Sequence, residues 1–271
     1  MVAPVKRRRA YMFCPGRSEE YSQKELIMKL AAISDIHGNL LALEAVLEDI
    51  EKHDVDVIVN LGDILSGGLF PAETADRLLP LNLPTIRGNH ERQLLETAPE
   101  KMGLSDRHAY RHLSPEHLEW LRKMPAGLTL HNDILLVHGT PGNDKEYLLE
   151  EVTETGVRES SHARIYEHIK HHNASLILCG HTHIPRCVEI SSTCLIVNPG
   201  SVGLQAYDDE HPFFHKMEAG SPHARYAILE KRANHWTVNF RKVVYDWEKA
   251  AGHALENDRP DWVNALRTGK M

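Results

Sequence analysis

The 271-residue sequence lacks several features that mark particular classes of protein. No apolar run approaches the roughly 18 residues needed to cross a bilayer, so we expect no transmembrane helix and no membrane partner. The four cysteines lack CxxC spacing, and in a chain of this length they do not suggest a disulfide framework. We therefore expect reduced cysteines and a cytoplasmic location.

The charge pattern also lacks the basic excess typical of proteins that bind nucleic acids. Lys and Arg number 31 against 38 Asp and Glu, which gives a net charge of -7, and the two signs are interspersed. A nucleic-acid groove normally appears as a basic patch or stripe. A nucleic-acid polymer is therefore an unlikely partner.

Residues 1–28 differ from the rest of the chain. They hold a basic cluster, "VKRRRA", followed by polar residues, without the apolar segment of a secretory signal. We expect a disordered tail here, and the position of Met28 directly before the first apolar run suggests a second possible translation start. Residues 29–271 are expected to form a single domain.

The first half of this domain alternates strand and helix patterns. An apolar run at 30–33 is followed by an amphipathic helix, with Asn39 as N-cap and Leu40, Leu43 and Leu47 on one face. The β-branched run 55–63, a short helix at 72–81 and a third strand at 84–90 follow. This alternation predicts parallel strands.

The second half predicts a mixed arrangement. The expected elements are a helix from Ser114 and Pro115 to 124, a hairpin at 128–140, a helix at 163–172, strands at 175–183 and 193–201, an antiparallel pair at 224–231 and 236–246, and C-terminal helices within 247–271. The fold class is therefore α/β, with a mixed, layered β-sheet flanked by helices.

Polar side chains with metal-binding groups cluster at the expected strand ends. They are Asp35, His37, Asp63, Asn89, His90, His138, His181 and His183. In sheets of this kind ligands collect at the carboxyl ends of the strands. Without His90, the set supplies seven oxygen or imidazole donors and no thiolate, which suits two divalent cations of the manganese, iron or zinc type.

Two such cations would need a shared ligand. Asp63 can bridge them because a carboxylate has two oxygens, and Gly62 beside it lets the backbone approach closely. Two cations about 3.5 to 4 Å apart would hold a water, lower its pKa and clamp a phosphoryl group. This chemistry predicts hydrolysis of a phosphate ester.

The motifs "SDIHGN", "NLGD", "RGNHE", "VHG", "GHTH" and "NPGS" occur in this order within residues 30–201. Together they resemble the calcineurin-like metallophosphoesterases, whose fold implies a two-sheet sandwich. The resemblance implies that Asp35, His37, Asp63 and His183 hold one metal, and that Asp63, Asn89, His138 and His181 hold the other. It also implies that His90 protonates the leaving group, and that residues 198–201 shape a turn beneath the site.

One segment departs from the serine/threonine protein phosphatases of this superfamily. Where those enzymes carry an Asp and an Arg after the bridging aspartate, this chain has Ser66 and Gly67. The residue that would orient His90 is therefore not identified. Arg87 either contacts phosphate or pairs with Glu91, and of the two we expect the ion pair with Glu91. The resemblance is greater to compact bacterial phosphoesterases that act on small phosphomono- or diesters.

The sequence thus predicts a dinuclear metal-dependent phosphoesterase that hydrolyses small phosphodi- or monoesters by attack of a metal-activated hydroxide. Residues 206–223, a long segment with two phenylalanines, are either a substrate-selecting lid or an edge-packing loop. One alternative function is a non-catalytic metal-binding scaffold of the same fold, although every candidate ligand and His90 are retained. A serine/threonine protein phosphatase or a nuclease is the other alternative, for which the sequence shows no recognition surface.

Overall fold

The computed structural model describes residues 28–233 and 235–271, so residues 1–27 of the expected tail lie outside the described residues, while Met28 begins the first strand. The first half contains β1 (Met28–Ile33), α1 (Leu40–Ile50), β2 (Val57–Asn60), α2 (Pro71–Leu78), α3 (Asn89–Glu96), α4 (Leu104–His112), α5 (Pro115–Lys123), β3 (Leu128–Leu130) and β4 (Ile134–Leu136). The second half contains β5 (Glu150–Thr153), β6 (Gly156–Glu159), α6 (His162–Ile169), β7 (Leu176–Leu178), β8 (Arg186–Ser191), β9 (Cys194–Asn198), β10 (Ala206–Asp209), β11 (His215–Glu218), β12 (Ala224–Arg232), β13 (His235–Val243), α7 (Trp247–Glu256) and α8 (Asp261–Thr268).

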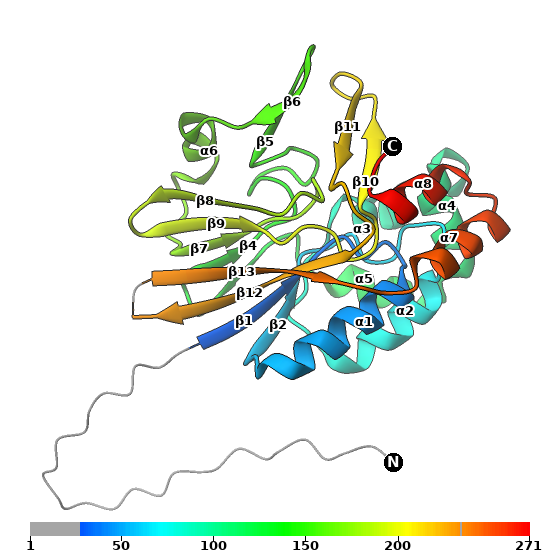
Figure 1. Ribbon diagram of the computed structural model, residues 1–271, viewed down its shortest axis with the longest axis horizontal. Helices are drawn as coiled ribbons and strands as arrows, with labels where there is room; N and C mark the ends of the chain where they lie inside the picture. Colours follow the sequence, from blue (N-terminus) through cyan, green and yellow to red (C-terminus); the bar gives the residue numbers. More distant parts are fainter. Residues whose placement is uncertain (1–27, 234) are drawn as a thin grey trace, which may run out of the picture.

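Two mixed sheets form the centre of the molecule (Figure 1). One has the strand order β13-β12-β1-β2, and the other has the order β3-β4-β7-β9-β8. Apolar side chains from both sheets, including Leu30, Val59, Leu136, Leu178 and Leu229, form one buried cluster. This cluster is the inner layer of a sandwich, so the predicted mixed α/β fold with two packed sheets is confirmed.

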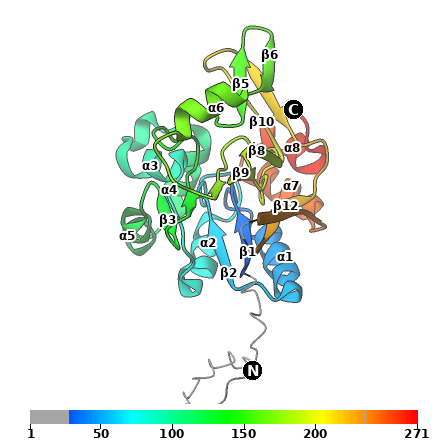
Figure 2. The same cartoon turned by 90° about the vertical axis from the view of Figure 1, so that its left-hand side faces the viewer.

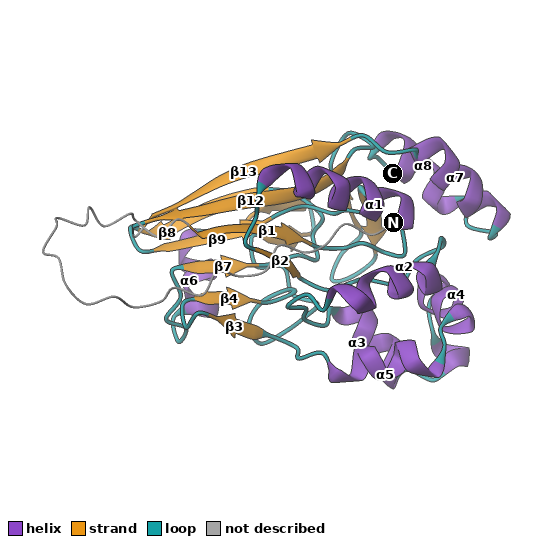
Figure 3. Ribbon diagram, turned by 90° about the horizontal axis from the view of Figure 1, so that it is seen from below, coloured by secondary structure: helices purple, strands orange, loops and turns teal. Residues whose placement is uncertain are grey.

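Helices cover the outer faces of the sandwich (Figures 2 and 3). The outward-facing Ala31 and Ile33 of β1 join a cluster with apolar residues of α1, α7 and α8, while Ile165 and Ile169 of α6 pack on the second sheet. Among residues 28–233 and 235–271, none of the helices combines the length and apolarity that a membrane crossing requires.

Helix α1 shows why the sequence prediction succeeds locally. Its N-cap is Asn39, whose side chain accepts a hydrogen bond from the backbone N–H of Ala42 at 3.1 Å. Leu43 and Leu47 lie on its buried face, as their spacing predicts, together with Val46, whereas Leu40 is only half-buried. The predicted hairpin of β3 with β4 and the antiparallel pair of β12 with β13 are also confirmed.

The third predicted strand, at 84–90, is wrong. Only Thr85 pairs with β2, through an isolated bridge to Asn60, and the chain enters α3 at Asn89. The cause is a helix-start signal: the Glu91 side chain accepts a hydrogen bond from the Gly88 N–H at 2.9 Å. Asn89 and His90 therefore begin a helix instead of ending a strand.

The sequence prediction also omitted α3, α4, β8 and the β5–β6 hairpin. Within 206–223, β10 and β11 pair antiparallel to form a second hairpin. Both hairpins stand above the strand ends of the sandwich (Figure 1), where they border the site described next.

Candidate metal centre

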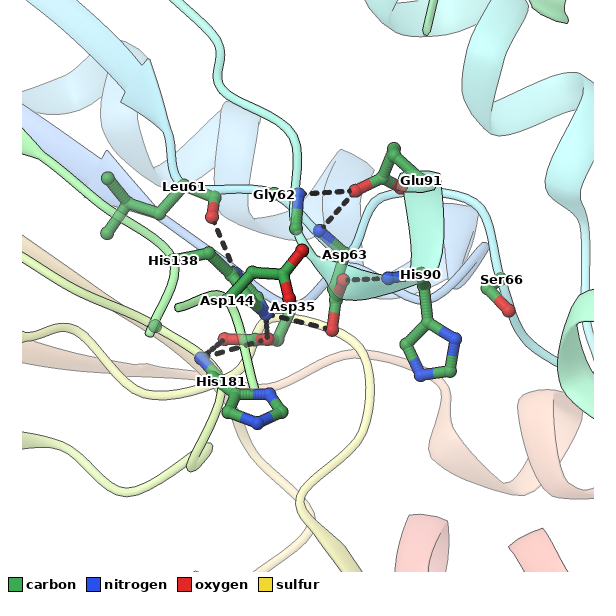
Figure 4. Close-up of polar contacts among 12 residues, drawn as sticks. Asp35, Leu61, Gly62, Asp63, Ser66, His90, Glu91, His138, Asp144 and His181 are labelled. Atoms are coloured by element: carbon green, nitrogen blue, oxygen red, sulfur yellow. Dashed lines mark hydrogen bonds and ion pairs between the residues drawn. The ribbon is translucent and has the colours of Figure 1, made fainter. Parts of the chain in front are cut away.

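The carboxyl ends of four parallel-paired strands deliver polar side chains to one edge of the sandwich. Asp35 and His37 follow β1, Asp63 follows β2, His138 follows β4, and His181 and His183 follow β7. The N-terminus of α3 adds Asn89 and His90. The structure therefore brings together every site residue that the sequence predicted. Figure 4 shows five of them, Asp35, Asp63, His90, His138 and His181.

Unusual backbone conformations turn these side chains toward one another. Positive φ angles occur at Asp35 (53°), His37 (51°), Asp63 (52°), His181 (69°) and His183 (61°). Each such conformation costs roughly 1–3 kcal/mol for a residue other than glycine. Interlocked turns hold the first three: the Asp35 N–H donates to Gly62 O, and the His37 N–H donates to Asp63 O, both at 3.0 Å.

Each of four histidines directs one ring nitrogen to a backbone carbonyl. The pairs are His37 Nδ1 with Ser66 O (2.7 Å), His138 Nδ1 with Leu61 O (2.8 Å), His181 Nε2 with Lys145 O (3.1 Å) and His183 Nδ1 with Leu204 O (2.5 Å). A carbonyl can only accept, so the nitrogen facing it carries the proton. When the histidine is neutral, its other ring nitrogen carries no proton, and its lone pair is free to bind a metal.

The first group of candidate ligands is Asp35, His37 and His183, all buried. His37 Nε2 and His183 Nε2 lie 3.1 Å apart, and His183 Nε2 lies 3.5 Å from Asp35 Oδ1. Burial and the neighbouring His183 lower the pKa of His37 to about 3, which keeps this imidazole neutral. Two imidazole nitrogens and a carboxylate oxygen in close proximity fit a divalent cation.

The second group is Asp63, His138 and His181. His138 Nε2 lies 3.0 Å from Asp63 Oδ2. Burial opposes protonation of His138, but the carboxylates of Asp63 and Asp35 outweigh it and raise its pKa to about 10. The carboxylates thus attract positive charge, which a metal ion supplies as well as a proton does.

The Asn89 side chain completes the second group. Its amide ends 3.0 Å from His181 Nδ1, 3.2 Å from His138 Nε2 and 3.3 Å from Asp63 Oδ2. Hydrogen bonding alone would turn the amide NH₂ toward these three acceptors, whereas a cation between them would be bound by the amide oxygen. The convergence of four acceptor-type atoms supports a metal-binding arrangement.

His90 lies beside this centre on the wall of a cavity. Its backbone N–H donates to Asp63 Oδ1 at 3.0 Å, and its Nδ1 lies 2.6 Å from Asp106 Oδ1. Burial opposes protonation of the ring, but Asp63 and Asp106 outweigh it and raise the pKa of His90 to about 9. Since Nδ1 is held by Asp106, Nε2 is the nitrogen available to a substrate.

Asp106 is the partner of His90 that the sequence did not reveal. It lies in the first turn of α4, where it also accepts a hydrogen bond from the Ser66 hydroxyl. Ser66 thus anchors Asp106. The only local signal was an acidic residue in a segment, 104–112, that was not predicted to be helical.

The expected Arg87–Glu91 ion pair is wrong. Glu91 is fully buried and instead accepts backbone hydrogen bonds from Asp63 and Ile64, each at 2.8 Å, and from Gly88 at 2.9 Å. Three N–H donors already surround the Glu91 carboxylate, which fixes the turn that carries Asp63.

The turn at 198–201 lies beneath the centre, as the motif predicts. The Asn198 amide donates to Gly180 O at 2.8 Å and to Thr182 Oγ1 at 3.0 Å, while the Ser201 hydroxyl donates to Asp35 O at 2.8 Å. These contacts tie the segment of His181 to the segment of Asp35 without presenting Asn198 or Ser201 to the cavity.

A cavity of about 1120 Å³ opens above the centre. His37, Asp63, Asn89, His90, His181 and His183 contribute to its floor and walls, and the β5–β6 and β10–β11 hairpins and α8 border the rest. Tyr147 and Tyr207, joined by a 2.6 Å hydrogen bond, lie against His181 and His183. A volume of this size accommodates a whole small-molecule ester.

The sequence matches the calcineurin-like phosphoesterase superfamily domain over residues 28–219. The chain therefore belongs to this family. The matched region contains both groups of candidate ligands and His90.

Two similar proteins cover most of the chain. A metallophosphoesterase from Sphaerobacter thermophilus has 27% sequence identity and a TM-score of 0.69, and the match covers 89% of this chain and all of the other. An uncharacterized protein of Methanocaldococcus jannaschii is 25% identical over 249 residues, which represent 86% of this chain and 95% of the archaeal protein.

Proposed function

We propose that this protein is a dinuclear metal-dependent hydrolase of small phosphodi- or monoesters. One observation carries the proposal: four buried or half-buried histidines, each with one nitrogen held by a backbone carbonyl, present their other nitrogens to two aspartates and one asparagine. Membership in a phosphoesterase family supports the same reaction class.

The proposed ligands divide between two sites. Asp35, His37, Asp63 and His183 would hold one metal, and Asp63, Asn89, His138 and His181 would hold the other. Asp63 is proposed to bridge the two sites because its carboxylate has two oxygens. Oδ2 lies beside His138, and Oδ1 accepts a hydrogen bond from the His90 N–H. Manganese, iron and zinc all suit this oxygen and nitrogen donor set.

Two divalent cations bound here would supply an activated water and neutralise charge on the phosphoryl oxygens. The chain's own contribution is orientation and proton transfer. Asp106 holds the His90 ring so that Nε2 faces the cavity, and its negative charge favours the protonated imidazole. His90 is therefore proposed to donate its Nε2 proton to the departing oxygen of the ester.

The acidic chain favours a small substrate over a polymer. A protein of net charge -7 gains little long-range attraction to a polyanion, while a single phosphate group can still be attracted locally by the metal centre. The size of the cavity agrees with a compact ester bound inside it. The β10–β11 hairpin is proposed to act in substrate selection, because Ala206, Tyr207, Asp208 and Asp209 line that cavity.

Hydrolysis of bis-p-nitrophenyl phosphate and p-nitrophenyl phosphate by manganese-loaded protein tests the proposal. We expect turnover of at least one ester by the wild type, and a loss of about 100-fold or more in Asp63→Asn, since the bridging charge is removed. Leu104→Ala is a matched control, because Leu104 is 64% exposed and lies outside the cavity. Folded, metal-loaded wild type that hydrolyses neither ester nor any member of a broad panel of natural phosphate esters would contradict it.

A further inference from the structure

Arg92 and Asp144 form an ion pair between α3 and the segment that follows His138. Arg92 Nε donates to Asp144 Oδ2 at 2.7 Å, and Arg92 Nη2 donates to Asp144 Oδ1 at 2.8 Å. The two residues are 52 positions apart in sequence, and their side chains are 35% and 24% exposed. This paired geometry fixes both the distance and the relative orientation of the two segments.

Asp144 belongs to a tightly folded segment, residues 139–147, which we call the 139–147 loop. Thr140 and Asn143 exchange backbone hydrogen bonds of 2.9 and 3.2 Å. A Cβ at Gly139 would lie 2.5 Å from Asn143 O and 2.6 Å from Glu146 O, so the loop folds back directly onto the residue after His138. The loop is therefore rigidly connected to one candidate ligand at its base.

The same loop orients a second candidate ligand. The Lys145 carbonyl lies 3.1 Å from His181 Nε2, and the Tyr147 ring packs against the His181 ring with a centroid distance of 5.0 Å. The carbonyl keeps the proton on Nε2, which leaves His181 Nδ1 free to face Asn89, His138 and Asp63. Displacing the loop would change both the tautomer and the direction of His181.

The other end of the ion pair lies on the helix that carries Asn89. Arg92 is three residues after Asn89 on α3, about one helical turn away. The ion pair thus joins the element that presents Asn89 to the loop that orients His181. The first group is held differently, because Ser66 O and Leu204 O orient His37 and His183.

We propose that Arg92 and Asp144 are positioning residues for the Asp63–Asn89–His138–His181 metal site and not for the Asp35–His37–His183 site. Arg92 and Asp144 link α3 to the 139–147 loop, and the Lys145 carbonyl of that loop orients His181. This link sets the geometry of the site that contains Asn89 and His181. This inference rests on the proposed function only in requiring that the two sites bind metal.

Calorimetric titration of metal-free protein with Mn²⁺ tests the inference, using Arg92→Gln and Asp144→Asn as two independent variants. We expect one of two Mn²⁺ equivalents to bind about 10- to 100-fold more weakly in either variant, the usual effect of losing an outer partner of a ligand. The other equivalent should keep its affinity within about twofold. Electron paramagnetic resonance at one to two equivalents should change from a spin-coupled pair toward an isolated Mn²⁺ signal.

Arg241→Gln is the matched control. Arg241 on β13 forms a comparable pair with Asp49 on α1, at 3.1 Å and with side chains 32% and 17% exposed, but neither segment carries a candidate ligand. It should lower stability similarly without affecting either Mn²⁺ equivalent. Equal weakening of both sites, or no change in either, in folded Arg92→Gln and Asp144→Asn would overturn the inference.

The same titration separates this inference from the proposed function. If wild type binds two equivalents and hydrolyses no ester, and both variants weaken only one equivalent, the positioning role is supported and the proposed hydrolase is contradicted. Wild type that hydrolyses esters, with variants that retain both Mn²⁺ affinities, would contradict the positioning role alone. Wild type that binds no Mn²⁺ would overturn both.

Discussion

Replacement of His90 by asparagine provides a detailed test of the proposed proton donor. The backbone N–H at position 90 donates to Asp63 Oδ1 at 3.0 Å, and the substitution leaves this N–H in place, so metal binding should be preserved. The variant removes the imidazole that reaches the cavity. General-acid catalysis contributes about 100- to 10,000-fold, so a loss of that size is expected for an ester that needs protonation.

The loss should depend on the leaving group. A p-nitrophenolate departs readily without a proton, whereas an unsubstituted phenolate or an alkoxide needs one. We therefore expect His90→Asn to reduce kcat/KM far more for methyl phenyl phosphate than for methyl p-nitrophenyl phosphate. Steady-state kinetics over a series of such diesters, with metal content checked for each variant, measures this dependence.

Asp106→Asn should produce a smaller version of the same pattern. The Asp106–His90 contact is a 2.6 Å hydrogen bond that involves a carboxylate with 8% side-chain exposure. Bonds to charged groups contribute about 1.5–3 kcal/mol, which corresponds to roughly 10- to 150-fold in rate. Equal losses for every leaving group in His90→Asn, or no loss at all, would refute the reasoning.

Three further predictions concern the centre and the fold. In Gly88→Ala the new Cβ would lie 2.2 Å from Asp63 Oδ1, so Mn²⁺ affinity measured by calorimetry should fall at least about tenfold; unchanged affinity would show that the turn can yield. Leu178→Ala removes a fully buried side chain between the sheets and should lower the free energy of unfolding by about 2–5 kcal/mol in urea, whereas a loss below about 1 kcal/mol would mean that the core closes around the gap. Removal of metal by EDTA should lower the Tm, because free metal at about 100 times its Kd stabilises the folded state by about 2.7 kcal/mol; an unchanged Tm in manganese-loaded protein would argue against binding at these sites.

The candidate ligands could be predicted from the sequence because most of them follow directly after a strand. Asp35, Asp63 and His138 each terminate a recognisable apolar run, and parallel strands bring such ends to one edge. The local order of the chain therefore predicted the spatial cluster. Asn89 and His90 were placed in the cluster as the end of a strand predicted at 84–90. That strand is wrong, but the N-terminus of α3 brings both residues to the same edge.

The residues that surround the ligands could not be predicted from the sequence in this way. Asp106, Tyr147 and Tyr207 reach the centre through tertiary packing of α4, the 139–147 loop and β10. No periodicity or motif marks them, since each depends on a long-range contact that local propensity does not encode. The same limit applies to Arg92 and Asp144, whose pairing depends on how α3 packs beside the loop.

Phosphodiester hydrolysis as a function of bound manganese tests the central claim most directly. Metal-free protein would receive Mn²⁺ in steps, and bis-p-nitrophenyl phosphate turnover and bound metal would be measured at each step. The two groups of candidate ligands predict that activity rises most steeply between one and two equivalents and then becomes constant. Full activity at one equivalent, or activity independent of bound metal, would contradict a dinuclear mechanism.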